Sequence, residues 1–268
     1  MDLTNTMKEN LVSVIMPVYN GSNYLSEAIT SVIVQSYSEW ELVIVNDGST
    51  EDISSIVERF EEHRIRYFTH HTRKGAAEAR NTALREAQGQ WIAFLDSDDV
   101  WEKDKLTKQI GFMKQHGYAF SYTCYVETDE LLRTGEKTFS GPQHIGKRLM
   151  HVYCWPGCLT VMYDASRVGL VQIAPIETNN DYALWLEVVK HVDCYLLKEC
   201  LAKRRRRSGS LSDKGAVYKM VSFYNLFRVV DKMNVLMSAS LTIVNVICYF
   251  LKKTFFVKQE YVFNRTTT

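Results

Sequence analysis

Three carboxylates lie within four residues at Asp96-Ser97-Asp98-Asp99, directly after an apolar run at residues 91–95. Carboxylates this close repel one another unless a cation lies between them. Mg²⁺ or Mn²⁺ takes one or two carboxylates in such places and completes its shell with phosphate oxygens. The cluster therefore predicts a divalent-metal site for a phosphorylated ligand. The alternative is a solvated turn in which Asp98 or Asp99 caps the next helix.

Two further polar positions follow apolar runs in the same way. Tyr19 follows residues 12–18, and Asp47 follows residues 40–45. Taken alone, the region of Asp47 is a plausible turn followed by a helix cap. In a parallel sheet, however, the carboxyl ends of the strands meet at one edge, where ligands bind. Asp47 would then accept hydrogen bonds from the N–H groups of a base.

Strand and helix patterns alternate over the first 125 residues. The strand patterns lie at residues 12–18, 40–45, 65–69 and 91–95, and the helix patterns lie at 22–35, 49–60, 75–87 and 106–117. This order predicts an α/β fold with a mostly parallel central sheet and helices on both faces. Beyond it, we expect a polar loop or lid at 131–150, a returning strand at 157–162 and a helix at 179–191.

Composition limits the class of protein. The 268 residues are 46% hydrophobic and 24% charged, which indicates a globular chain, and a net charge of +1 argues against a dedicated nucleic-acid binder. The charge is uneven, because residues 203–268 hold 13 basic and three acidic residues. An acidic body with a basic tail suits a cation at the body and anionic lipid or phosphate at the tail. The six cysteines form no C-x-x-C pair and no signal segment begins the chain, so we expect a reducing cytoplasm.

Three segments together, residues 12–37, 41–52 and 74–101, resemble the family 2 inverting glycosyltransferases. The resemblance covers all the major motifs of the family in order, and it implies the GT-A fold and a nucleoside-diphosphate sugar donor, usually a uridine one. Asn46 departs from the family, since many members have Asp there, and we expect Asp47 to keep the main role.

The resemblance implies a role for each matching position. The residues of the nucleotide site are Pro17, Val18, Tyr19, Asp47, Arg80 and Asp96. Of these, the first three would line the uracil site, Asp47 would hold the base, Arg80 would support the nucleotide and Asp96 would contact the ribose. Asp98 would bind Mn²⁺ or Mg²⁺ on the diphosphate, and Asp99 and Trp101 would shape the donor pocket.

An inverting transferase needs one general base near the acceptor hydroxyl. The resemblance places it at Asp181, with Asn180 in place of the usual acidic neighbour and Glu177 as the reserve candidate. In the alternative interpretation, Asn179 or Asn180 caps the helix and Asp181 only favours its dipole.

The basic run at residues 203–207 matches the family loosely. In related transferases this place carries an arginine-containing arm, which implies that Arg205 and Arg207 bind the donor diphosphate. The alternatives are contact with lipid phosphates and a solvated charged run.

Residues 233–251 carry no charge, a length that reaches across a bilayer. Polar residues repeat on one face and apolar residues on another: Asn234, Ser238, Thr242, Asn245 and Tyr249 on the first, and Met237, Leu241, Val244, Cys248 and Leu251 on the second. This pattern favours a helix lying on a membrane or packed against the body over a free span. The basic and aromatic residues that follow favour peripheral contact with an anionic membrane surface.

Together these observations predict a metal-dependent inverting glycosyltransferase that moves one sugar, forms a β-linkage and builds surface polysaccharide such as O-antigen or capsule. The acceptor would be a glycan on a polyprenyl diphosphate at the cytoplasmic face of a bacterial inner membrane. Residues 1–212 would form the GT-A domain, with donor half 11–125 and acceptor half 126–212, and residues 213–268 a helical basic extension. The alternatives are a sugar nucleotidyltransferase and a degenerate module that binds nucleotide or glycan; the oligomeric state stays open.

Overall fold

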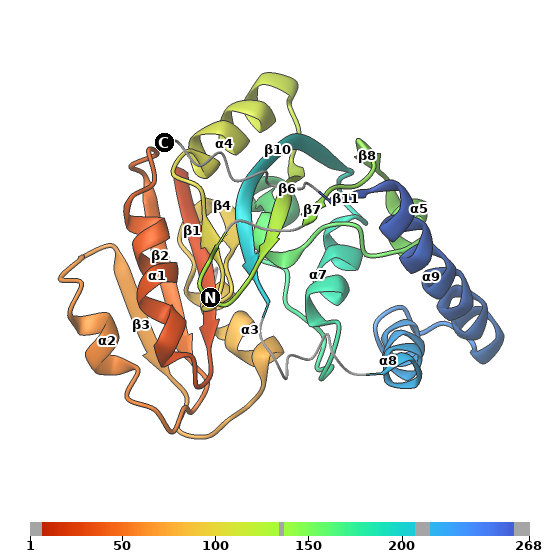
Figure 1. Cartoon of the computed structure of the whole chain (residues 1–268), viewed down its shortest axis with the longest axis horizontal. Helices are drawn as coiled ribbons and strands as arrows, with labels where there is room; N and C mark the ends of the chain where they lie inside the picture. Colours follow the sequence, from red (N-terminus) through yellow and green to blue (C-terminus); the bar gives the residue numbers. More distant parts are fainter. Residues whose placement is uncertain (1–6, 134–136, 207–214, 260–268) are drawn as a thin grey trace, which may run out of the picture.

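A computed structural model describes residues 7–133, 137–206 and 215–259. The first part alternates strands and helices: β1 (Lys8–Val18), α1 (Ser22–Ile33), β2 (Trp40–Asn46), α2 (Ser54–Glu58), β3 (Ile65–Thr69), α3 (Ala76–Glu86), β4 (Gly89–Phe94), β5 (Val100–Trp101) and α4 (Lys105–His116). Figure 1 shows these elements at one side of the molecule.

The second part adds the remaining elements: β6 (Phe120–Thr128), β7 (Lys137–Phe139), β8 (His144–Ile145), α5 (Lys147–Val152), a 3₁₀ turn η1 (Cys158–Thr160), β9 (Met162–Asp164), α6 (Ala165–Val168), α7 (Asn180–Val188), β10 (Cys194–Arg205), α8 (Ala216–Val229), α9 (Val235–Phe255) and β11 (Val257–Gln259). The region predicted as a loop at 131–150 thus contains β7, β8 and the start of α5, so that prediction was wrong there.

One sheet contains the strands in the order β11-β7-β6-β9-β4-β1-β2-β3. The strands β3, β2, β1 and β4 are parallel, as predicted. Beyond β4 the sheet becomes mixed, because β9 pairs antiparallel with both β4 and β6, while β10 pairs parallel with β6. The α/β architecture predicted from the sequence is confirmed, and its parallel part is the N-terminal half.

Burial on both faces explains the long apolar runs within β1, β2 and β4. On β1, Val12, Val14 and Met16 belong to one core and Ile15 to the other, since successive side chains point to opposite faces. Helices α1 and α4 cover the first core, and α3 and α7 cover the second. Both faces of the sheet are covered by helices. The polar side chains that follow the strands therefore lie at the carboxyl edge of the sheet.

Two local predictions differ from the structure. The pattern at residues 49–60 predicts a helix capped by Ser49 or Thr50, but α2 begins only at Ser54, where the carboxylate of Asp52 accepts the backbone N–H of Ser55 at 3.1 Å. Residues 158–160 form η1 before β9 begins at Met162, so the returning strand starts later than predicted.

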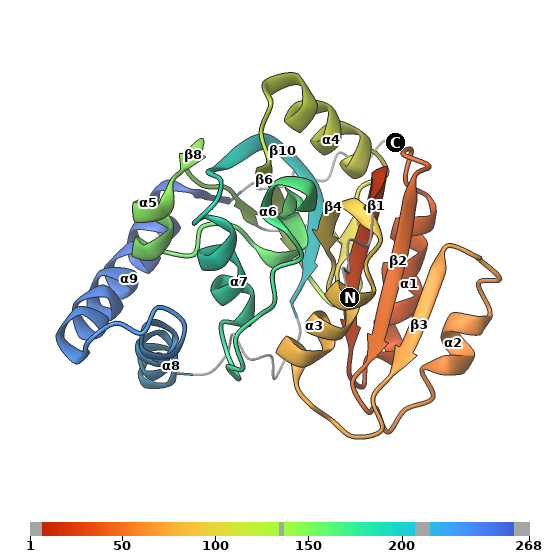
Figure 2. The ribbon, with the colours of Figure 1, turned by 180° about the vertical axis from the view of Figure 1, so that it is seen from behind.

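Helices α8 and α9 lie at the end of the molecule opposite α2 (Figures 1 and 2). The polar face of α9 packs against the body, with Ser238, Thr242 and Asn245 buried. The helix leaves large apolar side chains exposed, including Leu236 (79%), Ile243 (57%), Ile247 (53%) and Phe250 (62%). Of the apolar face predicted from the sequence, Met237 and Leu251 are exposed, whereas Leu241, Val244 and Cys248 turn to the body, so the prediction was only partly right. Among the described residues, α9 alone is long and apolar enough to cross a membrane.

Candidate active site

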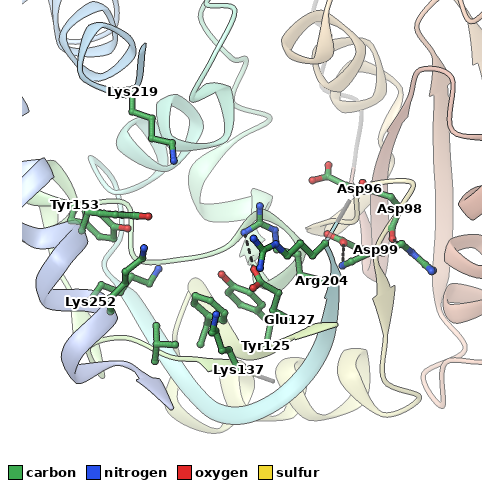
Figure 3. Close-up of a pocket in the computed structure, with 16 residues that line it drawn as sticks. Asp96, Asp98, Asp99, Tyr125, Glu127, Lys137, Tyr153, Arg204, Lys219 and Lys252 are labelled. Atoms are coloured by element: carbon green, nitrogen blue, oxygen red, sulfur yellow. Dashed lines mark hydrogen bonds and ion pairs between the residues drawn. The ribbon is translucent and has the colours of Figure 1, made fainter. Parts of the chain in front are cut away.

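The parallel strands bring their carboxyl ends together as the sequence predicts. Val18 at the end of β1 pairs with Asn46 of β2, and Phe94 of β4 pairs with Ile15 of β1. A cavity of about 590 Å³ opens from the segment that follows β4. Asp96, Asp98 and Asp99 form one end of it, as Figure 3 shows.

The aspartate cluster has one buried member and two partly exposed ones. Asp99 is buried and accepts the backbone N–H of Arg205 at 2.9 Å. Burial raises the pKa of Asp99 well above its usual range, and the charges of Asp98 and Asp96 raise it further. This crowding of carboxylates is the arrangement that a cation relieves.

A divalent cation fits these donors. Within the described residues, no group of three His, Cys, Asp or Glu side chains is placed to enclose a metal ion. Asp98 and Asp96 would therefore supply part of the coordination shell and leave the rest to phosphate oxygens and water, as Mg²⁺ and Mn²⁺ require.

Arg80 connects this cluster to the helix of the predicted base. Its side chain lies on α3, is buried, and donates hydrogen bonds to the carboxylate of Asp96 and to Asn180 Oδ1, the latter at 2.6 Å. Asp96 follows β4 and Asn180 begins α7, so one guanidinium holds together two segments 84 residues apart in the sequence.

Asp181 lies in the first turn of α7, and its carboxylate accepts the backbone N–H of Tyr182 at 2.8 Å. Burial raises its pKa, while the neighbouring charge of Arg80 opposes that rise. Asn179 occupies the N-cap position of α7, but neither Asn179 nor Asn180 makes a side-chain cap bond: Asn179 Nδ2 donates to Ser222, and Asn180 accepts from Arg80. Glu177 is exposed and lines a different cavity, beside α8.

Asp47 organises the loop beside the carboxyl end of β2. Its carboxylate is buried, accepts the N–H groups of Lys74 (2.9 Å) and Gly75 (2.7 Å), and lies 2.8 Å from His70 Nδ1. It therefore fixes the loop of residues 70–75, which packs so closely on Gly48 that a Cβ there would lie 2.7 Å from the backbone nitrogen of Arg73.

This loop brings Arg73 over the ring of Tyr19, 4.2 Å from its centroid. Tyr19 is 40% exposed, whereas Val18 is buried and Pro17 is partly buried. The pair of Tyr19 and Arg73 offers a flat, cationic surface suited to stacking on a base. Arg73 was missed, because only the loop held by Asp47 places it there.

Two side chains that were expected to contact the sugar donor point into the protein instead. Trp101 is buried, and its indole N–H donates to the carbonyl of Leu159 at 2.8 Å. Arg205 borders the cavity, but its guanidinium donates to the carbonyls of Asp98 and Glu130 and to the carboxylate of Glu27. These bonds use the donors that a diphosphate would need. Arg207 lies outside the described residues.

Arg204 takes the position in the cavity that was assigned to Arg205. Figure 3 shows it between Glu127 and Asp99, and its Nη1 lies 4.0 Å from the carboxylate of Glu127. The run at 203–207 contains it, but only the register of β10 on β6 decides which arginine faces the cavity. Lysines of α8 and α9 form the far end of the cavity, whereas the sequence pattern placed the basic residues after residue 251 at an anionic membrane surface.

Comparison with known proteins identifies the family of the chain. A family model described as Glycosyl transferase family 2 matches residues 13–164. The putative teichuronic acid biosynthesis glycosyltransferase TuaG of Bacillus subtilis is 40% identical over 205 residues, which cover 75% of this chain and 81% of TuaG.

Two further similarities were found. The Escherichia coli enzyme named UDP-Glc:alpha-D-GlcNAc-diphosphoundecaprenol beta-1,3-glucosyltransferase WfgD is 40% identical over 184 residues, 69% of this chain and 72% of that one. The crystal structure of S. aureus TarS 1-349 in complex with UDP-GlcNAc has a TM-score of 0.68 at 19% identity, covering 91% of this chain and 74% of that one, which is a likeness of fold.

The bridge made by Arg80 generates a stability prediction. Arg80→Met removes a buried guanidinium that bonds the partly exposed carboxylate of Asp96 and the amide of Asn180, and it should lower the free energy of unfolding by about 2 kcal/mol, measured by urea denaturation. Arg85→Met, on the same helix but at an exposed pair with Glu78, should cost less than about 1 kcal/mol. Equal losses of unfolding free energy in the two variants would contradict the role of Arg80 in joining β4 to α7.

Proposed function

The chain belongs to glycosyl transferase family 2, as its sequence motifs predicted, and on this premise we propose that it moves one sugar from UDP to a hydroxyl of a glycan linked to a lipid diphosphate. The observation that carries the proposal is that Arg80 joins the aspartate cluster to Asn180, the residue before Asp181, and places its charge near the Asp181 carboxylate. The name of WfgD, which gives a UDP-glucose donor and a diphosphoundecaprenol-linked acceptor, supports the choice of substrates.

In this proposal the donor half, residues 11–125, binds the nucleotide at the edge of the sheet. The base stacks on Tyr19 beside the loop that Asp47 holds, with Pro17 and Val18 behind it, and Asp96 accepts from the ribose. Asp98, with Asp96, would hold Mn²⁺ or Mg²⁺. When bound, the ion would neutralise charge on the departing diphosphate. Arg204 approaches the same diphosphate from β10, with Asp99 and Arg205 fixing the backbone beside it.

Asp181 is the proposed general base of the acceptor half, residues 126–212. Its carboxylate takes the proton of the acceptor hydroxyl as the hydroxyl oxygen attacks the anomeric carbon. The bond from that carbon to the diphosphate oxygen breaks, its electrons leave with the nucleotide, and an α-linked donor gives a β-linkage. A raised pKa makes Asp181 a stronger base, and the charge of Arg80 helps to keep it ionised near neutral pH.

Two alternatives fit less well. A sugar nucleotidyltransferase needs basic residues after the first strand to receive a triphosphate, and residues 19–23 contain none. A degenerate binding module would dispense with one of the two carboxylates Asp98 and Asp181, and both are present.

We further propose that α9 lies on the cytoplasmic face of a bacterial inner membrane as a peripheral contact. Its exposed apolar side chains form one face, and exposed cations flank both ends of the helix, at Arg228 and Lys232 before it and at Lys253 and Lys258 at its end. Apolar area between cations fits a leaflet that contains anionic lipid. A lipid-linked acceptor would be presented at this level.

Nucleotide binding tests the donor site. Calorimetry with UDP, and with GDP and dTDP as competitors, should show a preference for UDP that depends on Mn²⁺. Asp98→Asn should weaken the metal-dependent binding of UDP by about tenfold or more, while Asp104→Asn, an exposed carboxylate nearby, should leave it unchanged. Failure of folded protein to bind any of the three nucleotides would favour the degenerate module.

Asp181→Asn tests the base. This variant should bind UDP as the native protein does and lose transfer by about 10²- to 10⁴-fold. In the native protein, the pH profile of kcat/KM should fall on the acid side above the ordinary carboxylate pKa, because only the ionised base accepts a proton. Glu177→Gln should transfer normally. Near-native transfer by Asp181→Asn would remove Asp181 from this role.

Vesicle sedimentation tests the membrane contact. Replacing Ile243 and Ile247 together with Gln should weaken binding to vesicles of phosphatidylcholine and phosphatidylglycerol by about tenfold or more, since each side chain would otherwise be buried in lipid. Val34 and Leu131 are equally exposed apolar residues far from α9 in the sequence, and their replacement by Gln should have no effect. Unchanged binding of the α9 variant would contradict the proposal.

A further inference from the structure

The cavity of the aspartate cluster has a second end that is basic. Figure 3 shows Asp96, Asp98 and Asp99 on one side, Lys219 and Lys252 on the other, and Arg204 between them. Lys219 comes from α8, and Lys252 and its neighbour Lys253 come from the last turns of α9.

Lys252 is buried although it carries an ammonium group. Its Nζ donates to the carbonyl of Trp155 at 2.9 Å and lies 5.3 Å from the ring centroid of Tyr153. Burial lowers the pKa of Lys252 to about 8. An ammonium has three donors and a full charge, and one neutral carbonyl balances neither. Burying a cation in this way is costly unless an anion accompanies it.

Lys219 and Lys253 lie against one ring. Their Nζ atoms are 5.7 Å and 4.5 Å from the ring centroid of Tyr249. Within the described residues, the recorded contacts of the three ammonium groups are with aromatic rings and a carbonyl rather than with a carboxylate. Like charges that border one cavity repel one another, so a polyvalent anion would stabilise them.

The arginine between the two ends differs from the lysines. Arg204 has Glu127 beside it, and the charge of Asp99 also favours its ionised form. Arg204 is therefore offset by neighbouring carboxylates, whereas the recorded contacts of the lysines at the end formed by α8 and α9, away from the proposed metal site, include none.

We propose that Lys219, Lys252 and Lys253 bind a second diphosphate, the one that joins the acceptor glycan to its lipid. The inference rests on the proposed function and adds the residues that recognise the acceptor. The donor diphosphate lies at the aspartate end, and the acceptor sugar reaches from the lysine end toward it.

The position of Lys252 and Lys253 on α9 favours the diphosphate of the lipid-linked acceptor over that of the donor. Phe250 and Leu251 precede Lys252 directly and are 62% and 45% exposed, on the helix proposed to lie on the membrane. A lipid whose chain lies in the leaflet presents its diphosphate at the membrane surface, where these lysines would lie. The diphosphate of a soluble nucleotide sugar does not require a site at the membrane surface.

Binding of inorganic diphosphate tests the site without relying on transfer. With the full chain saturated with UDP and Mg²⁺, calorimetry should show one further diphosphate site. Lys219→Gln combined with Lys253→Gln should weaken that site by about tenfold or more and leave the Kd of UDP unchanged. Lys103→Gln combined with Lys114→Gln removes the same charge from exposed positions on the other side of β10 and should change neither. Both substituted lysines of the first variant lie on helix surfaces, so it should fold, and circular dichroism checks this.

Two results of that experiment overturn the proposal. An unchanged Kd for diphosphate in Lys219→Gln/Lys253→Gln shows that the lysines do not form the site. An equal loss of UDP affinity assigns them to the donor.

Transfer kinetics then separate the lipid acceptor from free diphosphate. With one glycan offered on a lipid diphosphate, on a diphosphate without lipid and on a neutral alkyl group, the double variant should raise KM about tenfold for the first two and leave KM for the third unchanged. A KM change that appears only with anionic vesicles would assign the lysines to the lipid surface and overturn the proposal. If the native protein uses none of these acceptors, the proposed function fails, and the calorimetry still decides whether the site exists.

Discussion

The buried guanidinium of Arg80 is the interaction on which the rest of the site depends. It joins Asp96, at the end of β4, to Asn180, at the start of α7, and its charge acts on Asp181. Its Nη1 and Nη2 groups donate to Asn180 and Asp96, while its Nε has no hydrogen-bond partner among the described residues. The two bonds that Arg80 does make hold the start of α7 beside the end of β4. Asn180 accepts as a neutral amide, which leaves the charge of Arg80 to Asp96 and Asp181. The substitution of Asn for an acid at this position thus preserves the bridge and alters only its electrostatics.

The sheet explains how much of this arrangement was visible in the sequence. Residues of β1, β2 and β4 are apolar on both faces, so their runs could be recognised, and Asp47 and Asp96 to Asp99 had to lie at the carboxyl edge. Arg80 and Asp181 were found through the family resemblance, and their link through Asn180 was not, because it joins residues 100 positions apart.

What could not be predicted depends on register and on long-range packing. In the basic run, only the pairing of β10 with β6 decides that Arg205 is used by Asp98, Glu130 and Glu27 while Arg204 faces the cavity. Trp101 follows the aspartate cluster in sequence, yet its hydrogen bond to Leu159 turns it into the core. The amphipathic pattern of α9 was recognised, but pattern alone did not reveal which face meets the body.

The packing of α9, with polar side chains toward the body, would connect a membrane surface to the proposed catalytic chemistry. A helix that only completed a soluble core would bury its leucine and isoleucine side chains, because apolar burial is the main gain of folding. Here Ser238, Thr242 and Asn245 are buried while Ile243, Ile247 and Phe250 are exposed, which is stable where a second apolar medium covers the outer face. Asn245 Nδ2 lies 3.4 Å from the hydroxyl of Tyr182, the residue next to Asp181. Helix α9, which would meet the lipid, therefore contacts helix α7, which would hold the base. The depth of α9 in the membrane surface would then set the position of Asp181 relative to a lipid-linked hydroxyl.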